Sequence, residues 1–504
     1  MLSAPKLDYA LLAPMLIILG AAIIGVLVEA FAKQAIRARL QLAIAVTAII
    51  IALEQIYRIR NQGSSIAAIT SVSIDSAGIY LQGAILVFAL LGILLIADQD
   101  NFVAQASTLP GSEEEAAALK TGKQQTEVYP LTLFAVAGMM LFPVATDYIT
   151  LFVALEVLSL PLYIMVGLSR RRRLLSQEAA LKYFLLGAYA SAFFLFGAAL
   201  LYGYSGSISL NGLTDAIRGA GGNDVLLLLG VVFLSVGLLF KVGAVPFHSW
   251  TPDVYQGAPT PITGFMAAAT KAAAFGATLR IFYVGLDAAQ ASWKPTIAAI
   301  AAITMIFGSI AAIAQRDIKR ILAFSSIAHA GFLLIAVVSL NKNALAASLF
   351  YLLVYGVATI GAFGIVTLVR DSAGEVSDVN RWVGLGKKSP LVAAVFSLFL
   401  LSFAGIPLTS GFVGKFAIFT AAYESGNIAL VVIGVLSSAI AVFFYIRLFL
   451  MLFFADATND SVSVVIPSVL TRISISIGAI LTILLGIAPS LLLNIAQNFA
   501  QFLR

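Results

Sequence analysis

Uninterrupted apolar stretches of about 20 residues recur along this sequence, and they restrict its possible folds more than any other feature. Each stretch is long enough to cross the hydrocarbon core of a bilayer, which is roughly 30 Å thick. The composition agrees, because 61% of the 504 residues are hydrophobic and only 11% are charged, against roughly 25% charged residues in soluble domains. The sequence therefore predicts an all-α integral membrane protein, because helices satisfy their backbone polar groups internally.

About fourteen membrane-spanning helices are predicted, with approximate boundaries. They lie near 9–31, 40–57, 76–97, 128–145, 147–168, 179–203, 224–248, 260–284, 294–314, 320–340, 343–369, 388–423, 428–454 and 470–494. The twelfth span is too long for one straight crossing and contains SFAGIPLTSGFVGKF, so we expect an interruption there. The start, MLSAPKLDYALLAP, lacks a basic n-region and a small-residue cleavage pattern, so we expect the first span to be retained.

The Lys and Arg residues of the loops predict how the chain is oriented. An even number of spans puts both termini on one side, and most loop Lys and Arg lie on the other side, including the run from Arg170 to Arg173. Because loops rich in Lys and Arg stay on the cytoplasmic side, both termini are expected to face the lumen or periplasm. The net charge of +6 then indicates topology rather than nucleic-acid binding. For the arginine run, a docking patch is the alternative to an orientation signal.

Residues that hold redox centres are scarce. The chain has no cysteine, so it can neither ligate an iron–sulfur cluster nor form a disulfide. His248 and His329 are its two histidines; they could ligate a haem, but both fit a different pattern, described below. No Gly-rich phosphate loop follows a strand. We therefore expect this chain to bind no cofactor and no metal, and any redox chemistry to belong to partner subunits.

Polar segments divide the chain into five expected parts. They are an N-terminal three-helix segment at 1–97, a polar cytoplasmic or stromal loop at 98–127, five-span units at 128–284 and 294–454, and a C-terminal loop with the last helix at 455–504. The polar loop contains the acidic run from Glu113 to Glu115. We expect this loop to be a solvated linker, with a partner-facing loop as the alternative.

Two short segments, one in each five-span unit, resemble each other. VGAVPFHSW near 242–250 and FAGIPLTSG near 403–411 both place a Gly and a Pro in mid-membrane, where proline removes a helix hydrogen bond. Paired broken helices at corresponding positions mark the transport site of repeat-built transporters. Because five is an odd number of spans, we predict that spans 4–8 and 9–13 are inverted repeats. Their seventh and twelfth spans would be interrupted at Pro246 and Pro407.

Four ionisable residues fall well inside the predicted spans and a fifth lies about one turn into the sixth span, although a charge at a helix centre costs about 2.5–3.5 kcal/mol on insertion scales. A dozen leucine-type residues can carry one such charge into the membrane, so insertion is feasible. That feasibility does not explain why the charges are present, and a functional site is the default hypothesis for them. The five residues are Glu156, Lys182, Lys241, Lys271 and Lys415.

These residue types can pass protons in a suitable environment. Burial and neighbouring cations lower the pKa of a lysine, and histidine titrates near neutrality without much help. We therefore expect the five charged residues to form a proton relay with His248 and His329 through bridging water. The alternatives are static ion pairs for the deep charges, a snorkelling position for Lys182, and satisfied polar residues for the two histidines.

Three other charged residues lie near predicted span ends. Arg280 and Arg447 are expected to extend their guanidinium groups toward the membrane surface. Asp317 is expected to cap the start of the tenth span, because aspartate is a favoured residue at helix N-termini. None of the three is expected to take part in the relay.

The whole pattern resembles the antiporter-like membrane subunits shared by complex I, its photosynthetic relatives and Mrp-type cation/proton antiporters. The matching stretches are LFVALEVLSLPLY, LLFKVGAVPFHSWTPDVYQGAPTP, FMAAATKAAAFGA, RILAFSSIAHAGF and GIPLTSGFVGKF, between about 128 and 454. In that family a glutamate of the fifth span pairs with a lysine of the sixth, and lysines of the seventh, eighth and twelfth continue a polar axis along the membrane midplane. The resemblance implies these roles for Glu156, Lys182, Lys241, Lys271 and Lys415.

Within the family, LKYFLLGAYASAFFLFGAALLYG is similar to the subunit 2 type of cyanobacterial and plastid NAD(P)H–plastoquinone oxidoreductases. The resemblance implies a proton-translocating subunit without a redox centre of its own. Partner subunits with iron–sulfur clusters would carry electrons from NAD(P)H or ferredoxin to plastoquinone. It also implies a thylakoid membrane, with a bacterial inner membrane as the alternative.

Two other functions stay open at this point. An Mrp-type monovalent cation/proton antiporter subunit would exchange Na⁺ or K⁺ for protons without redox partners. A metal-ion site would favour clustered carboxylates and carbonyls, and Glu156 is the one carboxylate placed deep in a span. A structural membrane subunit, whose charges only dock its neighbours, is the other alternative.

Overall fold

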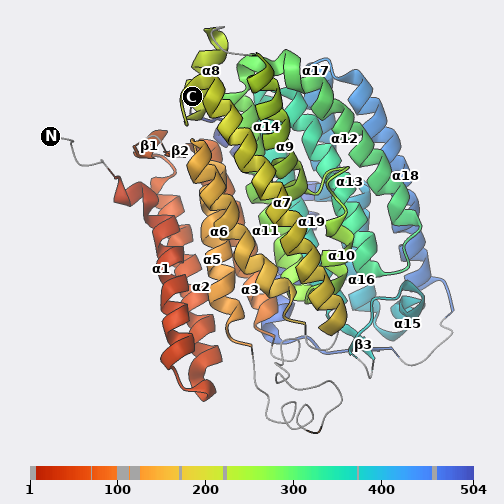
Figure 1. Cartoon of the computed structure of the whole chain (residues 1–504). Helices are drawn as coiled ribbons and strands as arrows, with labels where there is room; N and C mark the ends of the chain where they lie inside the picture. Colours follow the sequence, from red (N-terminus) through yellow and green to blue (C-terminus); the bar gives the residue numbers. More distant parts are fainter. Residues whose placement is uncertain are drawn as a thin grey trace.

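Helices run side by side through the computed structural model, which describes residues 7–69, 71–98, 113, 125–169, 173–219, 224–371, 374–456 and 462–503 (Figure 1). Twelve described helices are long and apolar enough to cross a membrane, and the shorter apolar helices at Val128–Val144 and Pro390–Ala404 add two further candidates. The expectation of an all-α membrane protein is confirmed. Most of the polar loop at 98–127 lies outside the described residues.

Three helices form the N-terminal segment. They are α1 (Tyr9–Phe31), α2 (Gln34–Ile59) and α3 (Ser76–Ile96). Between α2 and α3 lies a short antiparallel hairpin of β1 (Ser65–Ala68) and β2 (Val72–Ile74). Aspartates begin two of the helices, because the side chains of Asp8 and Asp75 accept hydrogen bonds from backbone N–H groups of the first turn.

The first five-span unit follows. Its helices are α5 (Val128–Leu141), α6 (Tyr148–Val166), α7 (Arg173–Ser205), α9 (Asp224–Val242) continued by α10 (Trp250–Gly257), and α11 (Thr260–Arg280). Two short elements lie at the ends of these helices, the 3-10 turn η1 (Phe142–Val144) after α5 and α8 (Leu210–Arg218) after α7. A π-helical turn, η2 (Ile281–Gly285), extends α11.

The second five-span unit repeats this order. Its helices are α12 (Gln290–Ile313), α13 (Ile318–Ser339), α14 (Lys342–Val366), α16 (Pro390–Ala404) continued by α17 (Ser410–Glu424), and α18 (Ile428–Phe453). In both units the fourth span is broken, α9/α10 in the first and α16/α17 in the second. Since five crossings are an odd number, the second unit begins on the membrane side opposite to the first.

The C-terminal part differs from the expected single span at 470–494. A helix α19 (Val469–Ile487) ends before Pro489, and a separate short helix α20 (Ser490–Phe499) follows. Ala488, between them, has a non-helical backbone, and a proline disfavours the α conformation in the residue before it. Apolar composition continued across this boundary, which is why the hydropathy pattern did not reveal it.

Small polar elements mark one end of the helix bundle, and both described termini lie at the other. Strands β3 (Val369–Asp371), β4 (Gly374–Glu375) and β5 (Ser463–Val464) form a sheet in the order β4-β3-β5. Figure 1 shows β3 and α15 (Leu385–Lys388) at the end opposite α8. Leu7 bridges Ala68, and the Leu503 N–H donates to Asp75 beside β2. The termini therefore share one side, as an even number of crossings predicts.

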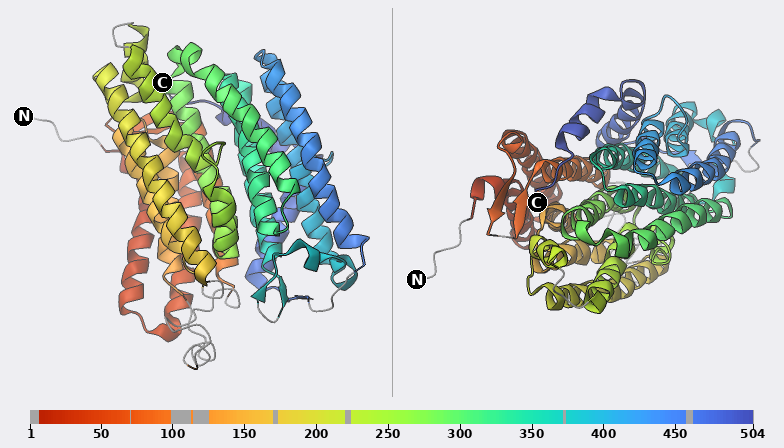
Figure 2. Two further views of the ribbon diagram at one scale, coloured as in Figure 1. Left: turned by 45° about the vertical axis from the view of Figure 1, so that its right-hand side comes forward. Right: turned by 90° about the horizontal axis from the view of Figure 1, so that it is seen from above.

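Three helices form the centre of the molecule. The most apolar windows of α11 and α13 are fully buried, and that of α14 is 94% buried. The other spans surround these three, and the view from above in Figure 2 shows the helices nearly end-on. The outer helices α2, α7 and α18 expose large aliphatic and aromatic side chains, as expected for surfaces that meet lipid or neighbouring subunits.

Arg280 does not reach toward the membrane surface as expected. Its side chain is fully buried and forms a bidentate ion pair with Asp75, at 2.8 Å for both nitrogen–oxygen contacts. Its guanidinium also lies 4.6 Å from the ring centroid of Phe502. The pair joins α11 to α3, which makes this arginine structural. Asp317 does cap its helix, because its carboxylate accepts the Arg320 N–H at 3.1 Å.

Candidate functional site

The first helix break lies between α9 and α10, where the expected Pro246 is found. Gly243 has a φ of +75°, a conformation that glycine adopts without strain. The carbonyl of Phe240 accepts the Trp250 indole Nε1–H at 2.9 Å and the Gly243 N–H at 3.1 Å. A side chain from α10 thus helps to satisfy a backbone group beside the break.

Lys241 lies one residue before the end of α9 and is only 4% exposed. Its Nζ has no hydrogen-bond partner in the structure, but it lies 5.5 Å and 5.2 Å from the ring centroids of Tyr163 and Tyr183. Cation–π contacts at such distances stabilise an ammonium by roughly 0.5–2 kcal/mol. Glu156 on α6 interacts electrostatically with Lys241 without forming an ion pair. Because no hydrogen bond or ion pair from the described part of the chain fixes it in one state, this buried amine can bind and release a proton.

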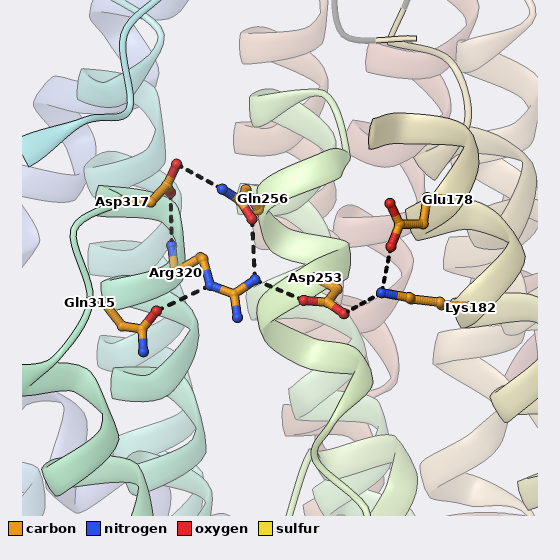
Figure 3. Close-up of polar contacts among 7 residues, drawn as sticks. All are labelled: Glu178, Lys182, Asp253, Gln256, Gln315, Asp317 and Arg320. Atoms are coloured by element: carbon orange, nitrogen blue, oxygen red, sulfur yellow. Dashed lines mark hydrogen bonds and ion pairs between the residues drawn. The ribbon is translucent and has the colours of Figure 1, made fainter. Parts of the chain in front are cut away.

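Glu156 does not pair with Lys182, contrary to the implication of the resemblance. Lys182 instead forms ion pairs with Glu178 at 2.6 Å and with Asp253 at 2.8 Å (Figure 3). The Lys182 side chain is 42% exposed, so it lies at the rim of the helix bundle rather than on the buried axis. Sequence spacing could not reveal Asp253 as its partner, because the two residues are 71 positions apart.

The contacts of Asp253 extend into a network that joins the two five-span units. Asp253 on α10 also accepts a hydrogen bond from Arg320 on α13 at 2.7 Å. Gln256, one turn further along α10, donates to Asp317 at 3.1 Å. Figure 3 shows these side chains converging between α7, α10 and the start of α13. The network fixes the outer end of α10, the short helix that follows the break.

A small cavity lies between Lys241 and Lys271. Thr251 and Tyr255 of α10 and Thr270 of α11 also line it. It leaves about 10 Å³ for the centre of a water molecule, close to what one water requires. The hydroxyls of Thr251 and Thr270 have no partner in the structure. Because buried polar atoms are normally hydrogen-bonded, a water in this cavity would provide them with a partner between the two lysines.

Lys271, in the middle of α11, is 5% exposed. Its Nζ donates to the Oγ of Ser326 at 2.6 Å and to the backbone carbonyl of the same residue. The ring centroid of Tyr355 is 5.2 Å away. Lys271 is therefore held by neutral groups, with no carboxylate as its counter-ion among the described ion pairs.

His329 lies on α13 between the second and third lysines of the axis. It is 2% exposed, and both Lys271 and Lys415 interact electrostatically with it. Its Nδ1 is hydrogen-bonded to the Tyr351 hydroxyl, and its Nε2 lies 3.4 Å from the Tyr445 hydroxyl. His329 is thus placed where a relay residue between these lysines would lie.

The second break separates α16 from α17 near Pro407. Lys415 on α17 donates to the carbonyls of Phe403 at 2.8 Å and Ala404 at 3.2 Å, which end α16, and to Ser438 at 3.1 Å. The C-terminal end of a helix carries a partial negative charge. The break therefore creates the acceptors that hold this buried ammonium, which is 4% exposed.

His248 has a different environment from His329. It lies in the first break, half-buried, with its ring 4.7 Å from that of Phe307. Its Nδ1 has no hydrogen-bond partner, and none of its described ring contacts is with a lysine or a carboxylate. The structure therefore does not bring His248 together with the buried lysines.

Comparisons with known proteins show the family of the chain. Residues 145–441 match the transmembrane family described as NADH:quinone oxidoreductase/Mrp antiporter. The chain belongs to this family. A relative in Rhodococcus opacus (strain B4), an NADH-quinone oxidoreductase subunit N, is 51% identical over 99% of this chain and 97% of its own. The subunit N of Mycobacterium bovis is 49% identical, with 100% of both chains covered.

Solved structures of the family share the fold. A chain of respiratory complex I from Thermus thermophilus has a TM-score of 0.77 at 31% identity, over 95% of this chain and 98% of its own. A chain of the Mrp complex from Dietzia sp. DQ12-45-1b has a TM-score of 0.78 at 20% identity, over 97% of this chain and 96% of its own. The second likeness shows the fold alone.

Sequence reasoning found the lysines of this family member but missed their neutral partners. Aromatic rings or hydroxyl groups surround each buried lysine. The rings belong to Tyr163, Tyr183, Tyr355 and Phe332, and the hydroxyls to Ser326 and Ser438. Tyrosines inside apolar spans were the available signal, since a buried tyrosine hydroxyl normally requires a partner.

Proposed function

We propose that this chain is the proton-translocating, subunit N-type membrane subunit of an NADH–quinone oxidoreductase. Its relatives of that name cover it from end to end at about half identity. Electron transfer would take place in partner subunits, which would hold the iron–sulfur clusters and bring the quinone. This chain would move protons across the membrane in response.

One observation carries the proposal. Lys241, Lys271 and Lys415 are each at most 5% exposed, and none of them forms an ion pair among the described residues. A buried charge without a counter-ion is expensive, so each amine can respond to a small change in the local field by binding or releasing a proton. A cavity lies between the first two amines, and hydroxyl groups contact the second and third. This arrangement suits proton transfer better than a purely structural role.

The relay would begin near the first break. Glu156 on α6 interacts electrostatically with Lys241, so a change at Glu156 would alter the electric field at that amine. A proton released by Lys241 would reach Lys271 through water in the cavity that both residues line. Protons would be taken up from the cytoplasmic side, where the polar network of Asp253 lies under the predicted topology. They would leave on the side of the two termini.

The relatives indicate the kind of membrane and the electron donor of the complex. The relatives compared here are NADH-quinone oxidoreductase subunits of bacteria, so we propose a bacterial inner membrane and NADH as the electron donor of the complex. These comparisons do not support the expected thylakoid location, or the likeness to the cyanobacterial and plastid subunit in particular. Plastoquinone as the acceptor stays a prediction from the resemblance.

A cation/proton exchange without redox partners is the second candidate, because the Mrp complex has the same fold. Such exchange requires a site for Na⁺ or K⁺. Among the described residues no group of three or more His, Cys, Asp or Glu side chains could hold a metal ion. The buried cations of the axis would also repel such an ion, which favours the proton.

The decisive test uses the assembled complex in sealed vesicles. In Lys241→Ala we expect quinone reduction by the complex to continue while the protons moved per quinone reduced decrease. Lys342→Ala is the matched control, because this lysine is exposed at the start of α14. Normal proton translocation by a fully assembled Lys241→Ala complex would falsify the relay. Sodium-dependent proton flux in the absence of quinone reduction would support the antiporter instead.

A further inference from the structure

Two tyrosine hydroxyls occupy both ring nitrogens of His329. Tyr351 on α14 contacts Nδ1, and Tyr445 on α18 lies 3.4 Å from Nε2. The imidazole is 2% exposed, and the ring centroid of Tyr355 lies 4.6 Å away. A proton that reaches or leaves this histidine has phenol hydroxyls as its immediate partners on both sides.

The hydrogen bonds continue from Tyr445 to the neighbourhood of Lys271. The Tyr445 hydroxyl lies 2.5 Å from the Oγ of Ser325, which is one turn before His329 on α13. The next residue, Ser326, accepts from Lys271 through its Oγ at 2.6 Å. One end of the hydrogen-bonded series therefore lies beside the lysine of α11.

The other end lies against the helix that carries Lys415. The ring of Tyr351 packs on Gly414, where a Cβ atom would be only 2.2 Å from its Cδ2. Gly414 directly precedes Lys415 in α17, and Lys415 interacts electrostatically with His329. The absence of a side chain at Gly414 lets the ring of Tyr351 pack against α17 while its hydroxyl contacts the histidine.

We propose that Tyr351 and Tyr445 are proton-transfer residues that connect His329 to the lysines on either side of it. The series runs from Ser325 through Tyr445 and His329 to Tyr351. A protonated Lys271 supplies the proton at one end. Each O–H or N–H then passes its proton on as it receives one, from Tyr445 to Nε2, from Nδ1 to Tyr351, and from Tyr351 to the unprotonated amine of Lys415. Only N–H and O–H bonds form and break, and rotation of the hydroxyls restores the starting arrangement. This inference rests on the proposed function.

The test replaces one hydroxyl at a time in the assembled complex. Tyr351→Phe and Tyr445→Phe remove the transferring group and keep the ring, and we expect the rate of proton transfer through this chain to fall by roughly ten-fold or more. Tyr423→Phe is the control, because this tyrosine is exposed near the end of α17, away from the imidazole. Ser325→Ala interrupts the series without touching the histidine, and a similar decrease is expected.

The double variant separates proton transfer from a structural role. If the two tyrosines act in series, the loss of either one already interrupts transfer. The double variant Tyr351→Phe with Tyr445→Phe should therefore move as many protons as the single variant that moves fewer. If each substitution instead caused an independent packing defect, the two reductions in proton movement would multiply. Multiplying effects, an equal loss in Tyr423→Phe, or normal pumping by both single variants would overturn the inference. If Lys415→Gln stops pumping while the tyrosine variants pump normally, the relay stands and only the tyrosine assignment fails.

Discussion

The ammonium of Lys415 lies 2.8 Å from the carbonyl oxygen of Phe403, on the other half of the same broken helix. Lys241, at the other break, has no hydrogen-bond acceptor among the described residues, and the Phe240 carbonyl there accepts from Trp250 and Gly243. The two breaks therefore hold their lysines differently. Backbone carbonyls stabilise the charged form of Lys415, whereas aromatic rings and the more distant Glu156 stabilise that of Lys241.

The hydrogen bonds of Lys415 can be separated from its ability to carry a proton. Lys415→Gln keeps amide donors for the carbonyls that end α16, so we expect the complex to assemble and to reduce quinone without normal pumping. Lys415→Met also loses the donors, and each unsatisfied buried carbonyl should cost about 1–3 kcal/mol. Pumping and the heat stability of the complex are measured for both variants. A glutamine variant that pumps normally would remove Lys415 from the relay.

Asp253 is expected to matter more for stability than either of its cationic partners. Asp253→Ala leaves Lys182 and Arg320 close together without their shared carboxylate, so it should lower the midpoint of heat denaturation more than Lys182→Ala. These side chains are 28–42% exposed, and solvent screening limits the coupling between Asp253 and Arg320 to about 1 kcal/mol. A double-mutant cycle measures that coupling, and a value of zero would contradict the network.

Gly414→Ala is expected to disturb the histidine site through Tyr351. The added Cβ would lie 2.2 Å from the tyrosine ring, and overpacking of this kind costs about 1–3 kcal/mol. Gly20→Ala is the control, because a Cβ there meets nothing within 4 Å. The heat stability of both variants is compared in the complex. Equal behaviour of the two variants would show that the close packing at Gly414 is unimportant.

Removing one member of the buried pair between α3 and α11 should be severe. Arg280→Met leaves the Asp75 carboxylate buried without its guanidinium, a loss of about 3–5 kcal/mol, so less chain should accumulate in the membrane. Asp75→Asn combined with Arg280→Met should recover part of the lost chain, since no unpaired charge remains. Quantitative immunoblots of membranes compare the two variants. A double variant that accumulates less than Arg280→Met would contradict this explanation.

The spans could be predicted because they depend on local composition. Apolar length revealed the helices, and a Gly and a Pro inside each of two apolar stretches revealed the breaks that became α9/α10 and α16/α17. The depth of Lys241, Lys271 and Lys415 followed from their positions within those stretches. A hydropathy pattern did not show where α19 ends, because apolar residues continue beyond it into α20.

Partners distant in sequence could not be predicted. Arg280 and Asp75 are 205 positions apart, and Lys182 meets Asp253 only because α7 and α10 pack against each other. The implied pair of Glu156 and Lys182 was wrong for the same reason, since residue type and depth do not specify which helices are neighbours. Tertiary packing decides these contacts, and it is not visible in a single sequence.

The docking of the chain's end beside α3 bears on the timing of biosynthesis. The Gln501 carbonyl accepts from the Ala77 N–H, and the Leu503 N–H donates to the Asp75 carboxylate. Leu503 and Asp75 are 428 positions apart, so the first turn of α3 gains these two contacts long after α3 itself has been synthesised. This corner of the molecule can therefore close only late, when the helices between the two segments already exist.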